Sequence, residues 1–233
     1  VRIEKQAMVN SAIATGDFFD LQPGNKALHC LPCKYVAGKM MFVRALILGL
    51  DMDVVEPSSH PVVKKDVKYD FVAMVPMQVQ NSITKLENVE KLIIGGSKID
   101  DELVKELSTL KTQVFETYGM TETLTHIAAK KIKEEAFHLL PNINITQDDR
   151  NCLVIDAPGI AVESVLTNDL IQLVGDRQFV LIGRIDNVIN SGGIKLIPEQ
   201  IEDKLSPKIN SRFFVAGIPD NVLGEKLILV IEG

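Results

Sequence analysis

The sequence predicts an α/β protein in which a mainly parallel sheet is covered by helices, followed by a small β-rich subdomain and an α+β segment. Three observations support this. Up to about residue 140, short apolar runs alternate with segments of helical periodicity, as in parallel sheets. Beyond it, short strand-like runs are separated by Gly, Asp and Asn. Hydrophobic residues make up 46% and charged residues 24% of the 233 positions, which excludes disordered and collagen-like chains.

The first part of the chain contains five short apolar runs that we expect to be strands. They are Ala27–Leu31, Asp53–Val55, Phe71–Val75, Leu92–Ile94 and Gln113–Phe115. Between them we expect a buried helix over Val36–Leu48, a helix opened by Pro76, and a helix whose apolar residues recur from Ile99 to Leu110. Asp100 and Asp101 suit the first turn of that last helix, because its partial positive charge attracts carboxylates.

The second part contains short strands and one helix. The expected strands are Asn142–Thr146, Cys152–Ile155, Leu170–Val174, Phe179–Ile182, Arg212–Ala216 and Lys226–Ile231. Pro198 begins a short helix that places Ile201 and Leu205 on one face, since proline is favoured in the first helical turn.

Composition narrows the class of protein. The formal net charge of −6 disfavours a nucleic-acid partner, because phosphate binding needs clustered Lys and Arg. No apolar run reaches the roughly 18 residues of a membrane span. Three cysteines, an odd and low number, fit a reducing compartment, so we expect a cytoplasmic protein. Cys30 and Cys33 form a C-x-x-C that suits buried packing better than a redox dithiol, and no second pair completes a zinc site.

Two stretches of the sequence contain residues suited to ligand binding or catalysis. Tyr118-Gly119-Met120-Thr121-Glu122-Thr123 follows a strand, so we expect a loop at the edge where α/β sheets bind ligands. Its Tyr offers a flat face for a base, and its Glu offers a hard oxygen for Mg²⁺. The alternative is an ordinary turn with exposed polar residues. The second stretch, Gly183 to Glu202, is by its own pattern a β-hairpin with a Gly-Gly turn and then a helix, with Arg184 and Asp186 as a surface ion pair.

Together these stretches resemble the acyl-adenylate-forming superfamily of acyl-CoA synthetases, adenylation domains and luciferases. Tyr118–Glu122 matches its Y-G-x-T-E signature, and Gly183–Glu202 matches G-R-x-D-x-x-I-x-x-x-G-x-x-(I/L)-x-P-x-x-I-E almost throughout. Thr167-Asn168-Asp169 stands where the family has T-G-D, with Asn in place of Gly. Further matches are the Gly95-Gly96 turn, Val215–Asp220 and Gly224–Lys226, so the resemblance covers nearly the whole chain.

The resemblance implies an ATP-dependent ligase that needs Mg²⁺ and coenzyme A, with a small carboxylic acid as the other substrate. It implies that Tyr118 stacks on adenine, that Thr121 contacts phosphate, and that Glu122 ligates Mg²⁺. Gly95, Gly96 and Gly119 would lie along the nucleotide.

The remaining implied site residues lie in the second half of the chain. By resemblance, Asp169 accepts from the ribose hydroxyls with Arg184 beside it. Asp186 is the hinge of a mobile C-terminal domain, and Gly192 and Gly193 form a loop that enters the site for thioester formation. Lys195 would face phosphate or CoA. The implied division is a large AMP-binding domain over residues 1–183, a hinge at 184–187 and a C-terminal domain over 188–233.

Two expected family segments are missing from the sequence, the phosphate loop and the C-terminal lysine. We therefore expect an incomplete ligase, inactive as the 233 residues stand. Leu31–Gly38 resembles the family's l-P-l-x-H-x-x-G, with Tyr35 where His is usual. This resemblance favours a packing role for Cys30 and Cys33 over a redox role.

Within the superfamily the chain is most similar to the o-succinylbenzoate–CoA ligases of menaquinone biosynthesis. Such an acid has a second carboxylate, for which Lys34, Lys39 or Arg44 would supply a cation, although each also fits a surface position. The alternatives are an adenylation domain that loads a carrier protein, and a binding module that keeps the fold without the chemistry. Intact Thr121, Glu122, Asp169 and Asp186 argue against the last.

Overall fold

The computed structural model describes residues 4–233, which form two compact units. One unit runs from residue 4 to 144 and includes 156–165, and the other comprises 145–155 with 166–233. The predicted hinge segment, residues 184–187, lies inside the second unit, so the functional boundary there stays a prediction.

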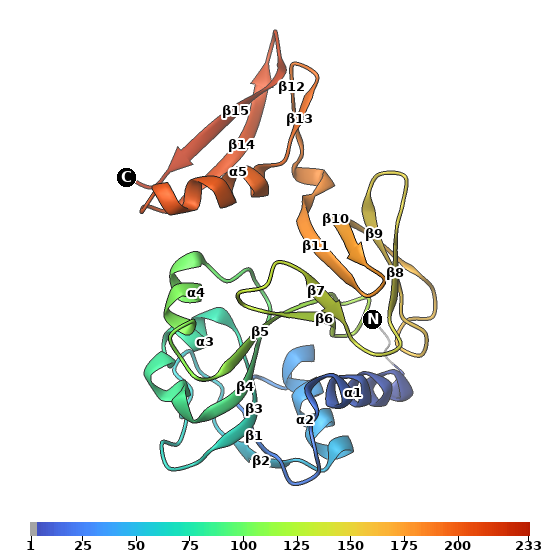
Figure 1. Ribbon diagram of the computed structural model, residues 1–233, viewed down its shortest axis with the longest axis vertical. Coiled ribbons are helices and arrows are strands. Elements are labelled where there is room, and N and C mark those ends of the chain that lie inside the picture. The colour runs from blue at the N-terminus through green and yellow to red at the C-terminus, as the bar shows by residue number, and fades with distance from the viewer. Residues whose placement is uncertain (1–3) are drawn as a thin grey trace. The chain divides into compact units, whose positions relative to one another are not determined.

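The sheet of the first unit has the strand order β2-β1-β3-β4-β5-β6-β7 (Figure 1). The first five strands in this order are parallel, and β6 and β7 are antiparallel to their neighbours. The strands are β1 (Lys26–His29), β2 (Asp51–Val54), β3 (Tyr69–Met74), β4 (Val89–Ile94), β5 (Gln113–Gly119), β6 (His126–Lys131) and β7 (Phe137–Leu139). The predicted α/β class with a mainly parallel sheet is confirmed.

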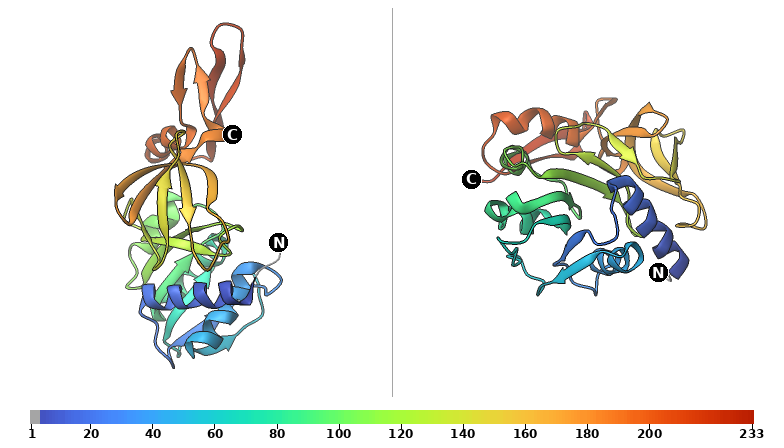
Figure 2. Two further views of the ribbon diagram at one scale, coloured as in Figure 1. Left: turned by 90° about the vertical axis from the view of Figure 1, so that its right-hand side faces the viewer. Right: turned by 60° about the horizontal axis from the view of Figure 1, so that its bottom comes forward.

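Helices cover both faces of this sheet, and the alternation of strand side chains decides which core each residue joins. Phe71 and Ile93 pack with residues of α1 (Lys5–Phe19) and α2 (Val36–Leu48). Val72 and Leu92, one position away, pack with residues of α3 (Pro76–Gln80) and α4 (Asp101–Leu107). Successive side chains of a strand point to opposite faces, so these apolar runs bury both faces. Figure 2 shows α1 lying along α2 on one of them.

Two helices differ from expectation. The pattern did not indicate α1, because its buried side is built mostly from small residues such as Ala7, Ala12 and Thr15 and gives weak apolar periodicity. Helix α4 ends at Leu107 rather than near Leu110. Asp100 caps this helix, accepting a 2.8 Å hydrogen bond from the Leu103 amide, instead of lying in its first turn.

The second unit holds two groups of strands, of which the second is antiparallel throughout. The first has the order β11-β10-β9-β8, from β8 (Asn144–Gln147), β9 (Cys152–Asp156), β10 (Val165–Gly175) and β11 (Gln178–Arg184). After the 3-10 turn η2 (Ile185–Asn187), a sheet of order β13-β12-β15-β14 follows. Its strands are β12 (Ile189–Ser191), β13 (Ile194–Leu196), β14 (Phe213–Asp220) and β15 (Gly224–Ile231), with α5 (Pro198–Leu205) packed on β14. The predicted β-rich subdomain and α+β segment are confirmed.

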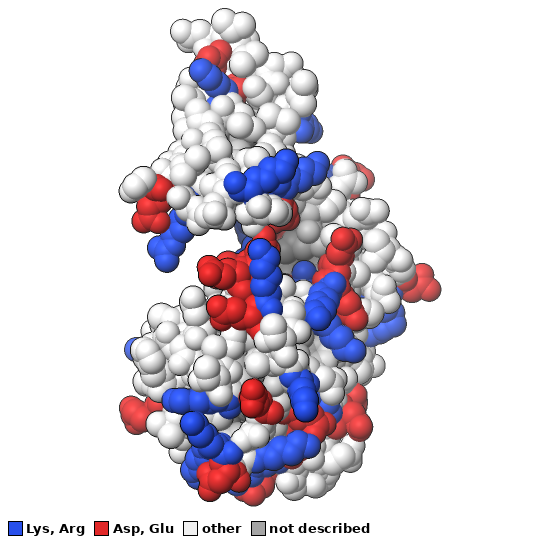
Figure 3. All heavy atoms as spheres, turned by 60° about the vertical axis from the view of Figure 1, so that its left-hand side comes forward, with Lys and Arg blue, Asp and Glu red and all other residues white. Residues whose placement is uncertain are grey.

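The surface carries charges of both signs. On the face drawn in Figure 3, Lys and Arg side chains alternate with Asp and Glu, and no continuous basic stripe crosses it. Within residues 4–233, none of the helices combines the length and apolarity that crossing a bilayer requires.

Candidate active site

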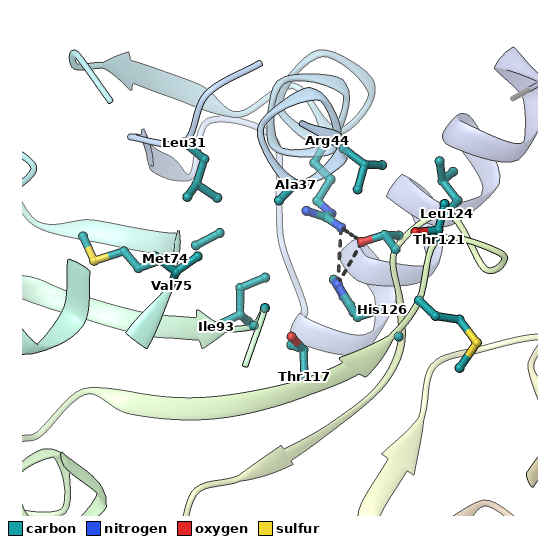
Figure 4. A pocket seen from close by; sticks show the side chains of 17 residues that line it. Leu31, Ala37, Arg44, Met74, Val75, Ile93, Thr117, Thr121, Leu124 and His126 are labelled. Atoms are coloured by element: carbon teal, nitrogen blue, oxygen red, sulfur yellow. Dashed lines mark hydrogen bonds between the residues drawn. The ribbon is translucent and has the colours of Figure 1, made fainter. Parts of the chain in front are cut away.

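A pocket of about 290 Å³ opens at the carboxyl edge of the parallel strands in the first unit (Figure 4). Leu31, Val75 and Gly95 line it where the chain leaves β1, β3 and β4. Thr117 and Gly119 line it from the end of β5. Open α/β sheets bind ligands at this edge, because neighbouring strand-to-helix loops diverge there. Most of the pocket wall is apolar, so it suits the hydrocarbon part of a small molecule.

One side of the pocket is formed by a buried arginine and its partners. Arg44, on α2, is 2% exposed. Its Nε donates to Thr15 Oγ1 at 3.2 Å, and its Nη2 donates to Thr125 Oγ1 at 3.0 Å and to His126 Nδ1 at 3.4 Å. Burial lowers the pKa of Arg44 to about 10, so the guanidinium remains charged at neutral pH. Within the described residues, no carboxylate pairs with it, and its Nη1 makes no hydrogen bond.

The hydrogen bonds assign the tautomer of His126. Nδ1 accepts from Arg44 and from the Thr125 hydroxyl at 3.3 Å, so the ring proton lies on Nε2. Nε2 then donates to Thr15 Oγ1 at 3.3 Å, and Thr15 donates to the Ser11 carbonyl at 3.0 Å. Burial, and secondarily the charge of Arg44, holds the pKa of His126 well below its usual range. A neutral imidazole therefore orients the cation without repelling it.

This buried imidazole predicts acid sensitivity. In the unfolded chain His126 binds a proton below its usual pKa of about 6.5, whereas the folded site resists protonation, so stability falls as the pH drops below that value. Replacing His126 by Gln removes this proton uptake. Urea unfolding at pH 7.5 and 5.5 should show the wild type losing roughly 1 kcal/mol more than the variant. Equal losses would mean that His126 does not resist protonation in the fold.

The Tyr118–Thr123 stretch forms a strand end and a tight loop. Tyr118 and Gly119 belong to β5, because pairing with β6 extends the strand past Phe115, so the prediction that they lie in a loop is wrong. The buried Thr123 hydroxyl accepts from the Met120 amide at 3.1 Å and donates to the Thr125 carbonyl at 2.9 Å. The loop from residue 120 to 125 is therefore held by its own hydrogen bonds.

Gly119 is required by close packing. A Cβ at this position would lie 2.4 Å from the carbonyl oxygen of Thr125 and 2.5 Å from Cα of His126. The pairing of β5 with β6 also shifts register between Tyr118 and Gly119. Any side chain here would push apart the strand and the loop that place Thr121 and His126 at the pocket.

The structure places most of the predicted residues of the first unit together. Gly95, Gly96, Gly119 and Thr121 line the pocket. The Tyr118 ring is half-buried with its centroid 5.9 Å from that of Phe137. Glu122 is exposed in the loop.

Of the three candidate cations near the acid pocket, only one lines it. Arg44 does so, whereas Lys39 is exposed on α2 and Lys34 is exposed with its Nζ 4.9 Å from the centroid of the Tyr35 ring. The surface alternative is therefore correct for the two lysines and wrong for Arg44. The sequence could not separate them, because burial depends on how α2 packs against α1.

The C-x-x-C pair has two different environments. Cys30 is fully buried, and burial raises the pKa of its thiol to about 12. Cys33 is exposed, so the expectation of buried packing is wrong for it, and its Sγ lies 3.2 Å from Nε2 of His29. Both are free thiols, as is Cys152.

In the second unit, Arg184 contacts both the predicted ribose-binding Asp169 and the predicted hinge residue Asp186. The pairing of β10 with β11 sets Asp169 opposite Arg184. Arg184 Nη1 lies 3.2 Å from Asp169 Oδ1, and its Nη2 lies 3.0 Å from Asp186 Oδ2. Asp169 is 8% exposed, whereas Asp186 is exposed on η2. The predicted pair of Arg184 and Asp186 is present, and Arg184 also holds Asp169.

Gly192 and Gly193 form the two-residue turn between β12 and β13. Their φ angles are 59° and 83°, and Ser191 pairs with Ile194 across them. Two successive positive φ angles are typical of a type I′ hairpin turn, which glycine adopts without strain. Lys195 is exposed next to this turn. The hairpin predicted from the Gly-Gly pair is confirmed, and the roles of these residues toward CoA stay predictions.

Three residues of the site were missed from the sequence. They are Thr15, Thr125 and His126, which come from α1, the loop and β6 and all contact Arg44. No spacing connects Thr15 with His126. A signal for His126 was available, because it lies four residues after Glu122, the last residue of the Y-G-x-T-E signature.

Comparison with known proteins agrees with these features. The family of AMP-binding enzymes matches residues 1–159. The chain belongs to this family. The matched residues include Tyr118–Glu122, so the resemblance of that stretch to acyl-adenylate-forming enzymes is confirmed.

Curated proteins that resemble this chain include 2-succinylbenzoate–CoA ligases. That of Haemophilus influenzae is 22% identical over 254 residues, covering 97% of this chain and 55% of the relative. That of Lactococcus lactis is 27% identical over 233 residues, covering 87% and 51%. The chain therefore spans about half the length of the curated relatives that it matches.

Solved structures show the same AMP-binding fold. An acyl-CoA synthetase (AMP-forming)/AMP-acid ligase II-like protein from Dyadobacter fermentans is 38% identical, with a TM-score of 0.76, covering 99% of this chain and 70% of that chain. MenE of E. coli is 21% identical with a TM-score of 0.82, covering 99% and 56%. MenE of Bacillus subtilis, in complex with ATP and magnesium ion, is 17% identical with a TM-score of 0.80, covering 99% and 57%.

Proposed function

We propose that this protein is an ATP-dependent, AMP-forming carboxylic acid–CoA ligase whose acid carries a second carboxylate, with 2-succinylbenzoate as the first candidate. The observation that carries the proposal is Arg44, a buried guanidinium at an apolar pocket with Nη1 free of hydrogen bonds to described residues. Removing a cation from water costs several kcal/mol, which a ligand carboxylate would offset by pairing with it. The similarity to 2-succinylbenzoate–CoA ligases supports the same acid.

The proposed reaction has two steps. An oxygen of the acid's reacting carboxylate attacks the α-phosphorus of ATP and pyrophosphate leaves, giving an acyl-adenylate. The CoA thiolate then attacks the acyl carbon, and AMP leaves with the bonding electrons. The first step converts a carboxylate, a poor electrophile, into a mixed anhydride.

Each unit supplies residues for this chemistry. In the first, Tyr118 offers its ring to adenine and Thr121, exposed at the pocket, offers a hydroxyl to phosphate. In the second, Asp169 would accept hydrogen bonds from the ribose hydroxyls, with its orientation set by Arg184. We propose that the 184–187 segment acts as the hinge at Asp186, and that Lys195 and the Gly192-Gly193 turn serve the CoA step.

The residues present fit a magnesium ion held mainly by substrate. Glu122 is exposed and makes no hydrogen bond or ion pair with a described residue. No group of three or more His, Cys, Asp or Glu side chains suited to a metal occurs within residues 4–233. Mg²⁺ is commonly bound by one or two carboxylates together with phosphates and water, so one free carboxylate fits this mode. The ion would neutralise charge on the phosphate oxygens during adenylation.

The test is an acid panel assayed for AMP release with ATP and Mg²⁺, with and without CoA. The matched pair is 2-succinylbenzoate and 4-oxo-4-phenylbutanoate, which lacks only the ring carboxylate. We expect CoA-dependent AMP release with the first acid and at least roughly 100-fold lower kcat/KM with the second, because an unpaired buried charge costs several kcal/mol. Equal turnover of the two acids would exclude a carboxylate-specific pocket, and pyrophosphate release without CoA-stimulated AMP release would favour a carrier-protein acceptor.

A further inference from the structure

The side chain of Asp186 is held from two directions. Arg184 binds Oδ2, as described above, and Asn168 Nδ2 donates to both Oδ1 and Oδ2 at 3.1 Å. Asn168 lies on β10, beside Asp169, so it ties the η2 turn back to the preceding sheet. The corresponding position of the family signature is Gly, which has no amide side chain. This hydrogen bond is therefore a feature of this chain and not of the signature.

The orientation of the Asn168 amide is set by a second arginine. Arg150 Nη1 donates to Asn168 Oδ1 at 3.1 Å, and Nη2 donates to the Thr167 carbonyl at 3.1 Å. Because Oδ1 accepts from a cation, Nδ2 must be the group that faces Asp186. Arg150 is itself held by Asp148, whose Oδ2 lies 2.7 Å from Nη2. Arg150, held by Asp148, thus orients the Asn168 amide toward the carboxylate of Asp186.

The other end of the turn is tied to α5. Glu199 Oε1 accepts from Asn187 Nδ2 at 2.6 Å and from the Arg184 amide at 3.3 Å. The Val188 amide donates to the Ile185 carbonyl at 3.3 Å and closes the η2 turn. The pairing of β11 with β10 holds Arg184, and side-chain hydrogen bonds hold Asp186 and Asn187. A change in φ at Asp186 carries its carboxylate away from Asn168, because the preceding strand β11 stays paired with β10.

We propose that Asn168 and Arg150 form a latch that holds the Asp186 turn in its present conformation and thereby sets the rate at which residues 184–187 rearrange between the two half-reactions. This rests on the proposed function, since only a two-step ligase needs the rearrangement. Asn168 and Arg150 are positioning residues, because they act through Asp186 and touch no substrate. Opening the latch removes no catalytic group, so the chemistry of each half-reaction stays the same.

The test uses Asn168→Ala in the complete protein, with Gln172→Ala as the matched control on an exposed position of the same strand. Hydrogen–deuterium exchange is followed in peptides covering residues 183–191. Exchange in the variant should be roughly three- to tenfold faster, as expected for loss of hydrogen bonds to an exposed charged group, and unchanged in the control. Arg150→Met, which frees the amide to turn, should accelerate exchange in the same direction.

Single-turnover measurements then compare adenylate formation with transfer to CoA. The ratio of their rate constants should change by roughly three- to tenfold in Asn168→Ala, because only one half-reaction uses the latched conformation. Unchanged exchange in residues 183–191 overturns the latch, whatever the ligase activity. Faster exchange with an unchanged ratio overturns its role in the rearrangement. If no acid on the panel is turned over, the proposed function fails, while faster exchange would still support the latch.

Discussion

Replacing Arg44 by Met is expected to lower kcat/KM for the dicarboxylic acid by roughly two to three orders of magnitude, because the acid's second carboxylate would enter an apolar pocket without a partner. The loss should appear mainly in KM for the acid, with KM for ATP unchanged. Methionine fills much of the volume of arginine, and replacing a buried charge by an apolar side chain is often neutral or stabilising. Steady-state kinetics and urea unfolding measure both effects.

The matched control is Lys39→Met, which removes a cation from an exposed position of the same helix. It should leave both kinetic constants within about twofold, since exposed charges contribute little. Turnover of 4-oxo-4-phenylbutanoate, which has no ring carboxylate, should not fall in Arg44→Met. An equal loss with both acids would mean that Arg44 supports the fold of the pocket rather than the recognition of an anion.

Replacing Glu122 by Gln is expected to slow adenylation by about 100-fold or more, while the free energy of unfolding changes by less than about 0.5 kcal/mol. Gln keeps the shape of the side chain and loses the charge proposed to ligate Mg²⁺. The side chain is exposed and has no partner within the described residues, so the fold does not depend on it. Pyrophosphate release without CoA isolates this step.

A magnesium titration distinguishes metal binding by Glu122 from any other role of this side chain. Raising Mg²⁺ should partly restore adenylation in Glu122→Gln, because a weakened site fills at higher concentration. Glu135→Gln, another exposed glutamate in the first unit, should need no extra Mg²⁺ and lose no rate. Near-normal pyrophosphate release by Glu122→Gln at ordinary Mg²⁺ would exclude Glu122 as the metal ligand.

The sequence was sufficient for those features that depend on local pattern. Strands such as Phe71–Val75 were predicted within two residues, because a continuous apolar run must be buried on both faces. The helix Val36–Leu48 was predicted with its observed bounds, and the Gly192-Gly193 pair indicated a hairpin because few other residues adopt two positive φ angles in succession. The spaced signatures placed the chain in its family.

Tertiary structure decided what depends on residues far apart in the chain. Arg44 was one of three equivalent cations in the sequence, and only the packing of α2 against α1 and β6 made it a buried charge at the pocket. The hydrogen bond from Asn168 to Asp186 spans 18 residues and arises from strand register, which no local pattern specifies. The physical reason is the same in both cases. Burial and hydrogen bonding depend on two segments that meet in the fold, whereas the periodicity of a sequence describes only one segment at a time.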